Sequence, residues 1–135
     1  MRIVAERIAL SFLGLPYVWG GDDPVQGFDC SGFVIEILKS VGVLPREGDW
    51  TADGLWRRFR DKEVPSPTLG CLVFWFNIEG RAVHVEFCLD DKLAIGASGG
   101  GRNVKTMQDA VRQNAYIKIR PILSRGGNKR FADPF

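Results

Sequence analysis

Cys30 occupies a place in the chain where a cysteine could act as a nucleophile. The residue follows a turn that ends at Gly27, and the apolar stripe of an amphipathic helix begins at Phe33. The pattern therefore predicts a helix from about Cys30 to Val41 with Cys30 at its N-terminus. Unpaired N–H groups and the helix dipole at such an end favour the thiolate, which is the nucleophilic form of cysteine. The alternative interpretation is a small apolar residue that starts a core helix, because free cysteine is usually buried and inert.

His84 is the only histidine in the chain, and it is the candidate for the base that a cysteine nucleophile needs. The alternation over residues 81–89 predicts a strand with Val83 and Val85 on one side and His84 and Glu86 on the other. The valine side suits the core, so an imidazole and a carboxylate would lie next to each other on the opposite side. A thiol at a helix start, packed against an imidazole on an antiparallel sheet, is the geometry of papain-like cysteine enzymes. The alternative is a histidine satisfied in the core or at the surface.

The elements that must position these side chains divide the sequence into a helical first part and a sheet-forming second part. Apolar periodicity and capping residues predict helices over residues 2–13, 30–41, 51–59 and 106–113. Runs rich in β-forming residues predict strands over 69–76, 81–89, 92–97 and 116–120, the first three as an antiparallel meander. The predicted fold class is α+β, in a single domain over residues 1–135 with a basic tail over 124–135.

The composition argues against several kinds of site and partner. A net charge of +2 is too small to indicate nucleic-acid binding, and three cysteines without a CxxC pair favour neither a disulfide framework nor a zinc site. With one histidine there is no multi-histidine centre, so we expect no metal and no organic cofactor. No run approaches the ~20 apolar residues of a membrane span. Charges at positions 2, 6 and 7 replace the apolar core of a secretory signal, which predicts synthesis in a cytoplasm.

Four segments, taken in order and with their spacing, resemble one known family. They cover residues 16–21, 28–34, 70–75 and 84–86 and read PYVWGG, FDCSGFV, GCLVFW and HVE. This series looks like the NlpC-type cell-wall cysteine peptidases, which have a papain-like fold, and the match covers about residues 3–123. Residues 95–101 resemble phage-encoded or prophage-encoded members of that group.

The resemblance implies hydrolysis of the stem peptides of peptidoglycan, between D-glutamate and a diamino acid such as diaminopimelate or lysine. Cys30 would be the nucleophile of a thioester acyl-enzyme, His84 would be the general base, and the backbone N–H of Cys30 would help to stabilise the oxyanion. Four further residues would border the substrate: Tyr17, Trp19, Asp29 and Ser31. The last two would flank a pocket for the free amino end of the stem peptide. The alternatives are an aromatic plug for Tyr17 and helix caps for Asp29 and Ser31.

One position departs from the pattern of the family. A third polar residue, often histidine, asparagine or glutamine, orients the base from the next strand in relatives, and the matching position here is Gly96. Glu86 is our candidate for this role, because a carboxylate beside His84 could hold the imidazole tautomer and stabilise imidazolium. The alternatives are a backbone carbonyl near Gly96, a water molecule, or a Glu86 that is merely an exposed strand residue. Relatives commonly carry aspartate in place of Cys71, and we interpret Cys71 and Cys88 as structural.

Two other functions stay open at this point. One is an enzyme of a different class on the same scaffold, such as an amidase, and the other is a non-catalytic module that binds wall peptides or a phage tail. The expected partners are peptidoglycan stem peptides and, for a phage protein, tail or virion proteins. The resemblance and the N-terminus together predict a protein made in the bacterial cytoplasm without a signal peptide. It would be virion-associated, or released to act on the cell wall.

Overall fold

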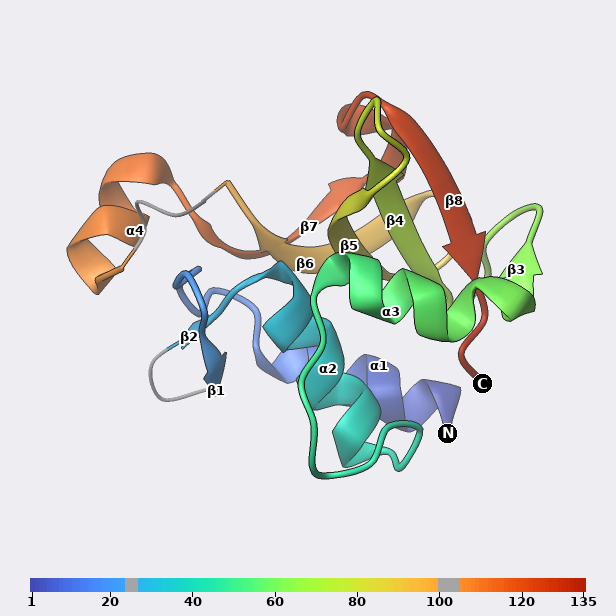
Figure 1. The fold of residues 1–135 in the computed structure, drawn as a ribbon. Helices are drawn as coiled ribbons and strands as arrows, with labels where there is room; N and C mark the ends of the chain where they lie inside the picture. The colour runs from blue at the N-terminus through green and yellow to red at the C-terminus, as the bar shows by residue number, and fades with distance from the viewer. Residues whose placement is uncertain (24–26, 100–104) are drawn as a thin grey trace.

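The computed structural model describes residues 1–23, 27–99 and 105–135 (Figure 1). The helices of the described chain are α1 (Arg2–Ser11), α2 (Cys30–Ser40), α3 (Ala52–Phe59) and α4 (Met107–Gln113), with the short 3-10 helices η1 (Arg60–Lys62) and η2 (Ile122–Ser124). The strands are β1 (Asp22–Asp23), β2 (Gly27–Phe28), β3 (Glu63–Val64), β4 (Leu72–Phe76), β5 (Ala82–Cys88), β6 (Leu93–Ser98), β7 (Tyr116–Pro121) and β8 (Asn128–Ala132). All four predicted helices and all four predicted strands are present within a few residues of their expected bounds.

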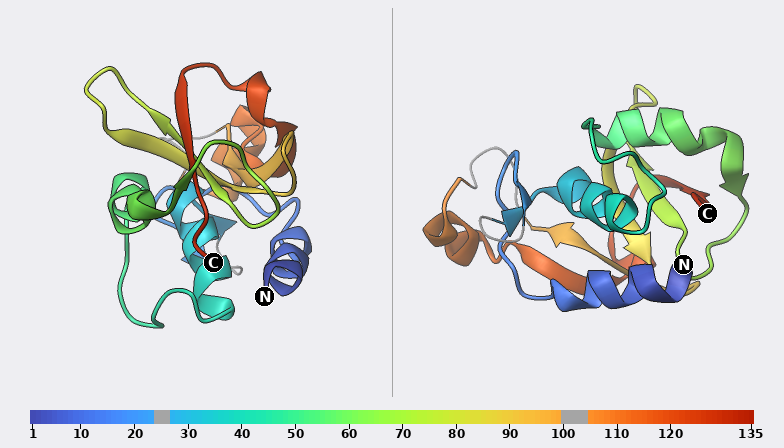
Figure 2. Two further views of the ribbon diagram at one scale, coloured as in Figure 1. Left: turned by 90° about the vertical axis from the view of Figure 1, so that its right-hand side faces the viewer. Right: turned by 90° about the horizontal axis from the view of Figure 1, so that it is seen from below.

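Six of the strands form one antiparallel sheet in the order β3-β8-β4-β5-β6-β7. Helices α1, α2 and α3 pack against one face of this sheet and form the main core with it (Figure 2). A smaller apolar cluster lies on the other face, between β4, β5, β6 and η2. The predicted α+β fold of N-terminal helices on an antiparallel sheet is confirmed, and so is the meander of β4, β5 and β6.

Helix α2 occupies the centre of the main core because one side of it is almost entirely apolar. Phe33, Ile37 and Leu38 are fully buried, and each such side chain stabilises the fold by about 2 kcal/mol. The ring of Phe33 packs edge-on against Phe28, which lies just before the helix, and both contact Phe12 after α1. The N-terminal end of α2 is directed at β5 and β6 (Figure 1). The helix thus carries its first residue to the sheet.

The predicted basic tail is wrong for residues 128–132, which form β8 in the interior of the sheet. This strand pairs with β4 on one side and β3 on the other, and Ala132 is fully buried. The cluster of cationic side chains suggested a solvated segment. In the structure only the charged ends of these side chains reach outward, and the backbone is paired as a strand. Arg130 shows how: its guanidinium lies 5.8 Å from the ring centroid of Trp56, and its Nε is 3.5 Å from Glu63.

The two ends of the chain lie next to each other and are joined by one ion pair (Figure 1). Arg2 donates two hydrogen bonds to the carboxylate of Asp133, at 2.8 and 2.7 Å. We expect Asp133→Asn to lower the free energy of unfolding by about 1 kcal/mol at neutral pH, measured by urea unfolding. The exposed Asp91→Asn is the matched control.

The effect of Asp133→Asn should depend on pH. The hydrogen bond from Arg2 lowers the pKa of Asp133 in the folded protein. The stabilisation is therefore present above the unfolded-state pKa and is lost as the pH falls through the folded-state pKa. A stability difference between variant and wild type that persists undiminished in acid would contradict this origin.

None of the helices in the three described stretches is both long and apolar enough to cross a bilayer. Of the segment 95–101, which carried the likeness to phage-encoded proteins, residues 100 and 101 lie outside the described residues. Residues 95–98 of that segment belong to β6.

Candidate active site

The start of α2 is fixed against a turn of the chain, and this contact sets the position of Cys30. The Asp29 carboxylate accepts a hydrogen bond from Gly32 N–H at 2.7 Å, which caps the helix, and one from Gly20 N–H at 3.2 Å, which ties the turn to it. A Cβ on Gly32 would lie 2.2 Å from the carbonyl oxygen of Gly21. Only glycine therefore lets the helix begin this close to the turn. Cys30 follows the cap and is partly exposed.

Strand β5 carries His84 on the face of the sheet that holds the smaller cluster. His84 pairs with Trp75 of β4, and the centroids of the two rings are 5.3 Å apart. The register between β4 and β5 shifts next to this pair, so that Val83 becomes an extra, bulged residue. The prediction that Val83 faces the core with Val85 is therefore wrong: Val83 is 50% exposed, whereas Val85 is fully buried.

His84 lies between the thiol of Cys30 and the carboxylate of Glu86. Its Nε2 is 2.7 Å from Oε2 of Glu86, and each of these two side chains is more than nine-tenths buried, with 7% and 6% exposed. The thiol of Cys30 lines the same cleft as His84 and lies close enough to raise the pKa of its ring. Because Nε2 is occupied by Glu86, Nδ1 is the nitrogen left for the sulfur. The structure thus brings together the three side chains that the sequence singles out for chemistry.

The surroundings of His84 act on its pKa in opposite directions. Burial lowers the pKa of the imidazole, because it disfavours the charged form. The hydrogen bonds to Cys30 and Glu86, and the charges on both groups, raise the pKa, and the net shift is upward. The surroundings therefore favour the protonated, imidazolium form of His84.

Gly96 provides the space that the side chain of Glu86 occupies. A Cβ at position 96 would lie 2.4 Å from Cγ of Glu86 and 2.9 Å from its Cδ, so any side chain there would displace the carboxylate. Glu86 is buried, so the alternative of an ordinary exposed strand residue is wrong. The missing side chain on β6 and the carboxylate on β5 thus form one arrangement, in which one strand supplies the polar group and the next makes room for it.

An open cleft of about 700 Å³ leads to Cys30 and His84. Tyr17 and Trp19 both line it, the first buried and the second half exposed. Burial raises the pKa of Tyr17, and the charges of Cys30 and Asp29 raise it further. The phenol therefore keeps its proton at neutral pH and can donate a hydrogen bond into the cleft.

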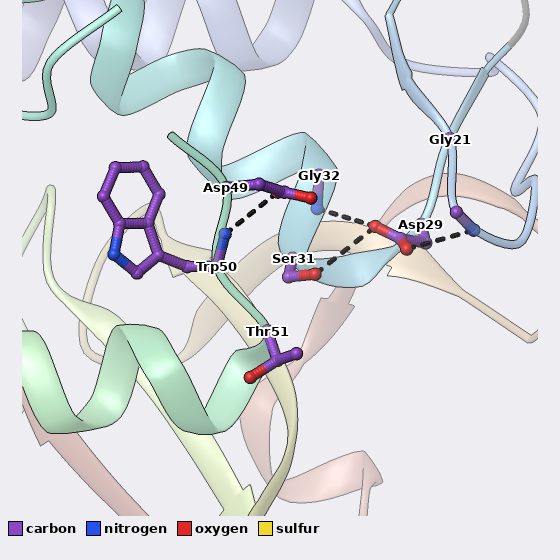
Figure 3. A pocket seen from close by; sticks show the side chains of 8 residues that line it. Gly21, Asp29, Ser31, Gly32, Asp49, Trp50 and Thr51 are labelled. Atoms are coloured by element: carbon purple, nitrogen blue, oxygen red, sulfur yellow. Dashed lines mark hydrogen bonds between the residues drawn. The ribbon is translucent and has the colours of Figure 1, made fainter. Parts of the chain in front are cut away.

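A second hollow, of about 210 Å³, is also lined by Asp29 and Ser31 (Figure 3). Ser31 donates a hydrogen bond to Asp29 at 3.4 Å, and Asp49 lines the same hollow. Burial raises the pKa of Asp29, the N–H groups of Gly32 and Gly20 act against this, and the charge of Asp49 adds to the rise. No cationic side chain is found among the described residues that line the hollow. An ammonium group is the ligand that such a pair of carboxylates suits.

Sequence reasoning missed several residues that line the cleft, among them Thr51, Arg81 and Arg125. Thr51 was predicted only as a helix cap, a role that it also has, since its Oγ1 accepts a hydrogen bond from Gly54 N–H at 3.0 Å. Arg81 lay inside the strand predicted over residues 81–89 but was not singled out there; in the structure it directly precedes β5. Arg125 gave no signal, because it lies in the segment predicted as a tail.

Cys71 and Cys88 lie in the sheet away from the cleft, and both are buried. Burial raises the pKa of the Cys88 thiol, and the neighbouring Cys71 adds to this rise. Both cysteines contribute to the smaller apolar cluster. Within the described part of the chain, no group of three His, Cys, Asp or Glu residues is arranged to hold a metal ion.

Comparison with known proteins identifies relatives of this site and fold. The family model described as NlpC/P60 family matches residues 14–121. The "Probable peptidoglycan endopeptidase LytE" of Bacillus subtilis is 30% identical over 133 residues, which is 96% of this chain and 34% of that protein. The "Gamma-D-glutamyl-L-lysine dipeptidyl-peptidase" of Bacillus subtilis is 44% identical over 78 residues, which is 54% of this chain and 24% of that protein. This chain thus spans about a third and a quarter of the lengths of these two relatives.

Solved structures give the same result. The crystal structure of the NlpC/p60 domain of the peptidoglycan hydrolase SagA superimposes with a TM-score of 0.72 at 25% sequence identity, over 98% of each chain. An NlpC/P60 family protein from Bacillus cereus superimposes with the same TM-score at 27% identity, over 93% of this chain and 36% of the other. Because the family model spans most of the sequence and the fold agrees over its whole length, the chain belongs to the NlpC/P60 family.

Proposed function

We propose that this domain is a peptidoglycan endopeptidase that cuts stem peptides between γ-linked D-glutamate and the diamino acid that follows. The observation that carries the proposal is the series of contacts from Cys30 through His84 to Glu86 at the base of an open cleft. The names of the relatives support the substrate, since one is a probable peptidoglycan endopeptidase and another is named for the γ-D-glutamyl-L-lysine bond.

The reaction would run through a thioester. The Cys30 thiolate attacks the γ-carbonyl carbon of glutamate, and a C–S bond forms as the carbonyl oxygen takes up negative charge. The Cys30 backbone N–H and the hydroxyl of Tyr17 are the donors for this oxyanion. The imidazolium of His84 gives its proton to the leaving nitrogen as the C–N bond breaks. A water molecule then attacks the thioester, His84 accepts its proton, and the C–S bond breaks to release the acid.

Glu86 would act as a positioning residue for His84 throughout this cycle. Its carboxylate accepts a hydrogen bond from Nε2–H, which fixes the tautomer that presents Nδ1 to the sulfur, and it stabilises the imidazolium form of His84. The hollow beside Asp29 and Ser31 would take the ammonium end of a stem peptide that has lost its glycan, with Trp19 bordering the path to the thiol.

Digestion of defined muropeptides tests the proposed reaction. With lysine or diaminopimelate in the third position, mass spectrometry should detect L-alanyl-D-glutamate, free or still joined to its sugar, and a fragment that begins with the diamino acid. Cleavage between the glycan and L-alanine would instead indicate an amidase. Binding of the peptides without any cleavage would indicate a non-catalytic module, and either result would overturn the proposal.

The role of Glu86 can be tested without changing Glu86 itself. Gly96→Ala places a Cβ where the Glu86 side chain lies, so we expect turnover to fall at least about tenfold, because small displacements of catalytic groups are costly. Overpacking should also cost about 1–3 kcal/mol of stability. The matched control is Gly126→Ala, where an added Cβ meets nothing within 4 Å. Unchanged turnover in Gly96→Ala would show that a backbone carbonyl or a water molecule, and not Glu86, orients His84.

The cellular setting stays a prediction. A phage protein of this kind would be carried in the virion, with tail or virion proteins as partners, or released to act on the cell wall. Mass spectrometry of purified particles from an infected or induced culture would detect it in the first case. Its absence from particles, together with wall-degrading activity in the culture fluid, would favour release.

A further inference from the structure

Arg125 presents a guanidinium to the cleft from the end of η2, in a segment with no expected role. It is half-buried and lines the same cleft as Cys30 and His84. Trp75 holds it at two points: the guanidinium carbon lies 5.6 Å from the centroid of the Trp75 ring, and Trp75 Nε1–H donates a hydrogen bond to the Arg125 carbonyl at 3.2 Å. Contacts with Trp75 of β4 therefore fix the position of this cation.

The same tryptophan connects Arg125 to the reacting groups. The ring of Trp75 packs against the imidazole of His84, with centroids 5.3 Å apart. The charge of Arg125 also reaches Tyr17, where it acts against the rise in pKa that burial produces. Arg125 thus shares the cleft with Tyr17 and His84, the two groups that the proposed reaction places around the substrate carbonyl.

Two arginines are found among the described residues that line the cleft, and of these Arg81 lies 4.0 Å from Asp53. Carboxylates lie within 4.0 Å of the following: Arg2, Arg57, Arg81, Arg112 and Arg130. Among the described residues, no carboxylate lies within that distance of Arg125. Glu86 and Arg125 both border a small hollow behind the Trp75 ring, but the Glu86 carboxylate is engaged by His84. A half-buried cation that faces a cleft without a carboxylate partner suits a ligand that brings one.

We propose that Arg125 is a substrate-binding residue that holds a free carboxylate next to the scissile amide. The inference rests on the proposed function, because a glutamate linked through its γ-carboxyl keeps its α-carboxylate free, only a few bonds from the reacting carbonyl. The diamino acid on the leaving side is a second source of the same group. An ordinary α-linked peptide offers no such carboxylate on the acyl side, so Arg125 would favour the γ-linked bond.

Three synthetic peptides separate the two sources. The parent is L-Ala-γ-D-Glu-L-Lys, the second carries D-isoglutamine in place of D-glutamate, and the third carries a C-terminal amide; a parallel set has diaminopimelate. For the wild type, we expect kcat/KM to fall on the order of tenfold for whichever amide removes the bound carboxylate. Arg125→Gln should lose about the same factor on the parent peptide and show no preference between the parent and that amide. Arg125→Lys should keep part of the preference, since it retains the charge but not the planar fork.

Two control variants make the result specific. Lys129→Gln removes a nearby positive charge outside the cleft, on the strand position opposite Trp75, and should keep the wild-type preference. Arg81→Gln removes the other cleft arginine, which already lies 4.0 Å from Asp53, and should keep it too. Unfolding curves should show that Arg125→Gln is folded, because the hydrogen bond from Trp75 goes to the carbonyl of residue 125, which the substitution keeps.

The outcomes distinguish this inference from the proposed function. A wild type that cuts all three peptides equally would overturn the role of Arg125 and leave the endopeptidase intact. An equal loss on all three peptides in Arg125→Gln would also overturn it, because the arginine would then act on His84 or Glu86. Loss of preference in Arg81→Gln would assign the carboxylate to that residue instead. Wild-type protein that cuts none of the peptides would refute the endopeptidase proposal itself, and this inference with it.

Discussion

Replacing Cys30 with alanine is expected to reduce hydrolysis of stem peptides by at least about 10⁴-fold, to the level of the uncatalysed background in a practical assay. No thioester can form without the sulfur, and the described residues of the cleft offer no second thiol, since Cys71 and Cys88 are buried in the sheet. Product release from defined muropeptides, followed by mass spectrometry, measures the loss.

The fold should survive this change. Cys30 is partly exposed, and the cap of α2 is made by Asp29 and not by the thiol. The variant should therefore unfold near the wild-type temperature and still bind the peptides. Cys71→Ala is the matched control, because it removes a thiol that the mechanism does not use; it should lower stability and spare the chemistry. Residual hydrolysis near wild-type rates in Cys30→Ala would exclude the residue as the nucleophile.

Replacing Glu86 with alanine should lower turnover on the order of 10²- to 10³-fold. The variant removes the group that holds Nε2 of His84, so the ring loses both its tautomer and its orientation. Glu86→Gln keeps a hydrogen-bonding oxygen but not the charge, so its loss should be smaller. Glu79→Gln, in the exposed turn after β4, is the matched control.

The pH profile provides a readout that a purely structural role would not move. The hydrogen bond and the charge of Glu86 both raise the pKa of His84, whereas burial lowers it. Without Glu86 the pKa of His84 falls, and the imidazolium loses its proton at a lower pH than in the wild type. The alkaline limb of kcat/KM should therefore move to lower pH in both variants. A limb that stays in place while the rate falls would show that Glu86 supports the fold and does not tune the base.

The helical part of the molecule and the identity of the central residues could be predicted from sequence because local patterns encode them. The apolar residues after Cys30 repeat with the period of a helix and lie on one side of it. The aspartate and threonine caps act on N–H groups only three residues further along the chain. The shared side of His84 and Glu86 follows from the alternation of a strand. Glycine at position 96 marked the missing side chain, which directed attention to the carboxylate that fills its place.

The remaining features depend on contacts that sequence periodicity does not carry. The bulge at Val83 arises where the register between β4 and β5 shifts. Valine is an ordinary strand residue, so the sequence does not indicate the bulge. Strand β8 was read as a tail because Lys129 and Arg130 dominate its composition, while its pairing with β4 depends on a strand about fifty residues earlier. Arg125 belongs to the same misread segment. Its place in the cleft is set by Trp75, a contact across the sheet.

His84 and Glu86 come from one strand, and this has a consequence for protein engineering. Their separation is set by the pleat of a single backbone, at about 3.3 Å of rise per residue, and not by how two strands happen to align. On the proposed role of Glu86, we expect the pair to be transferable into another family member as three consecutive residues, His-Val-Glu. A glycine on the adjoining strand, in place of the third polar residue found there in relatives, would make room for the carboxylate.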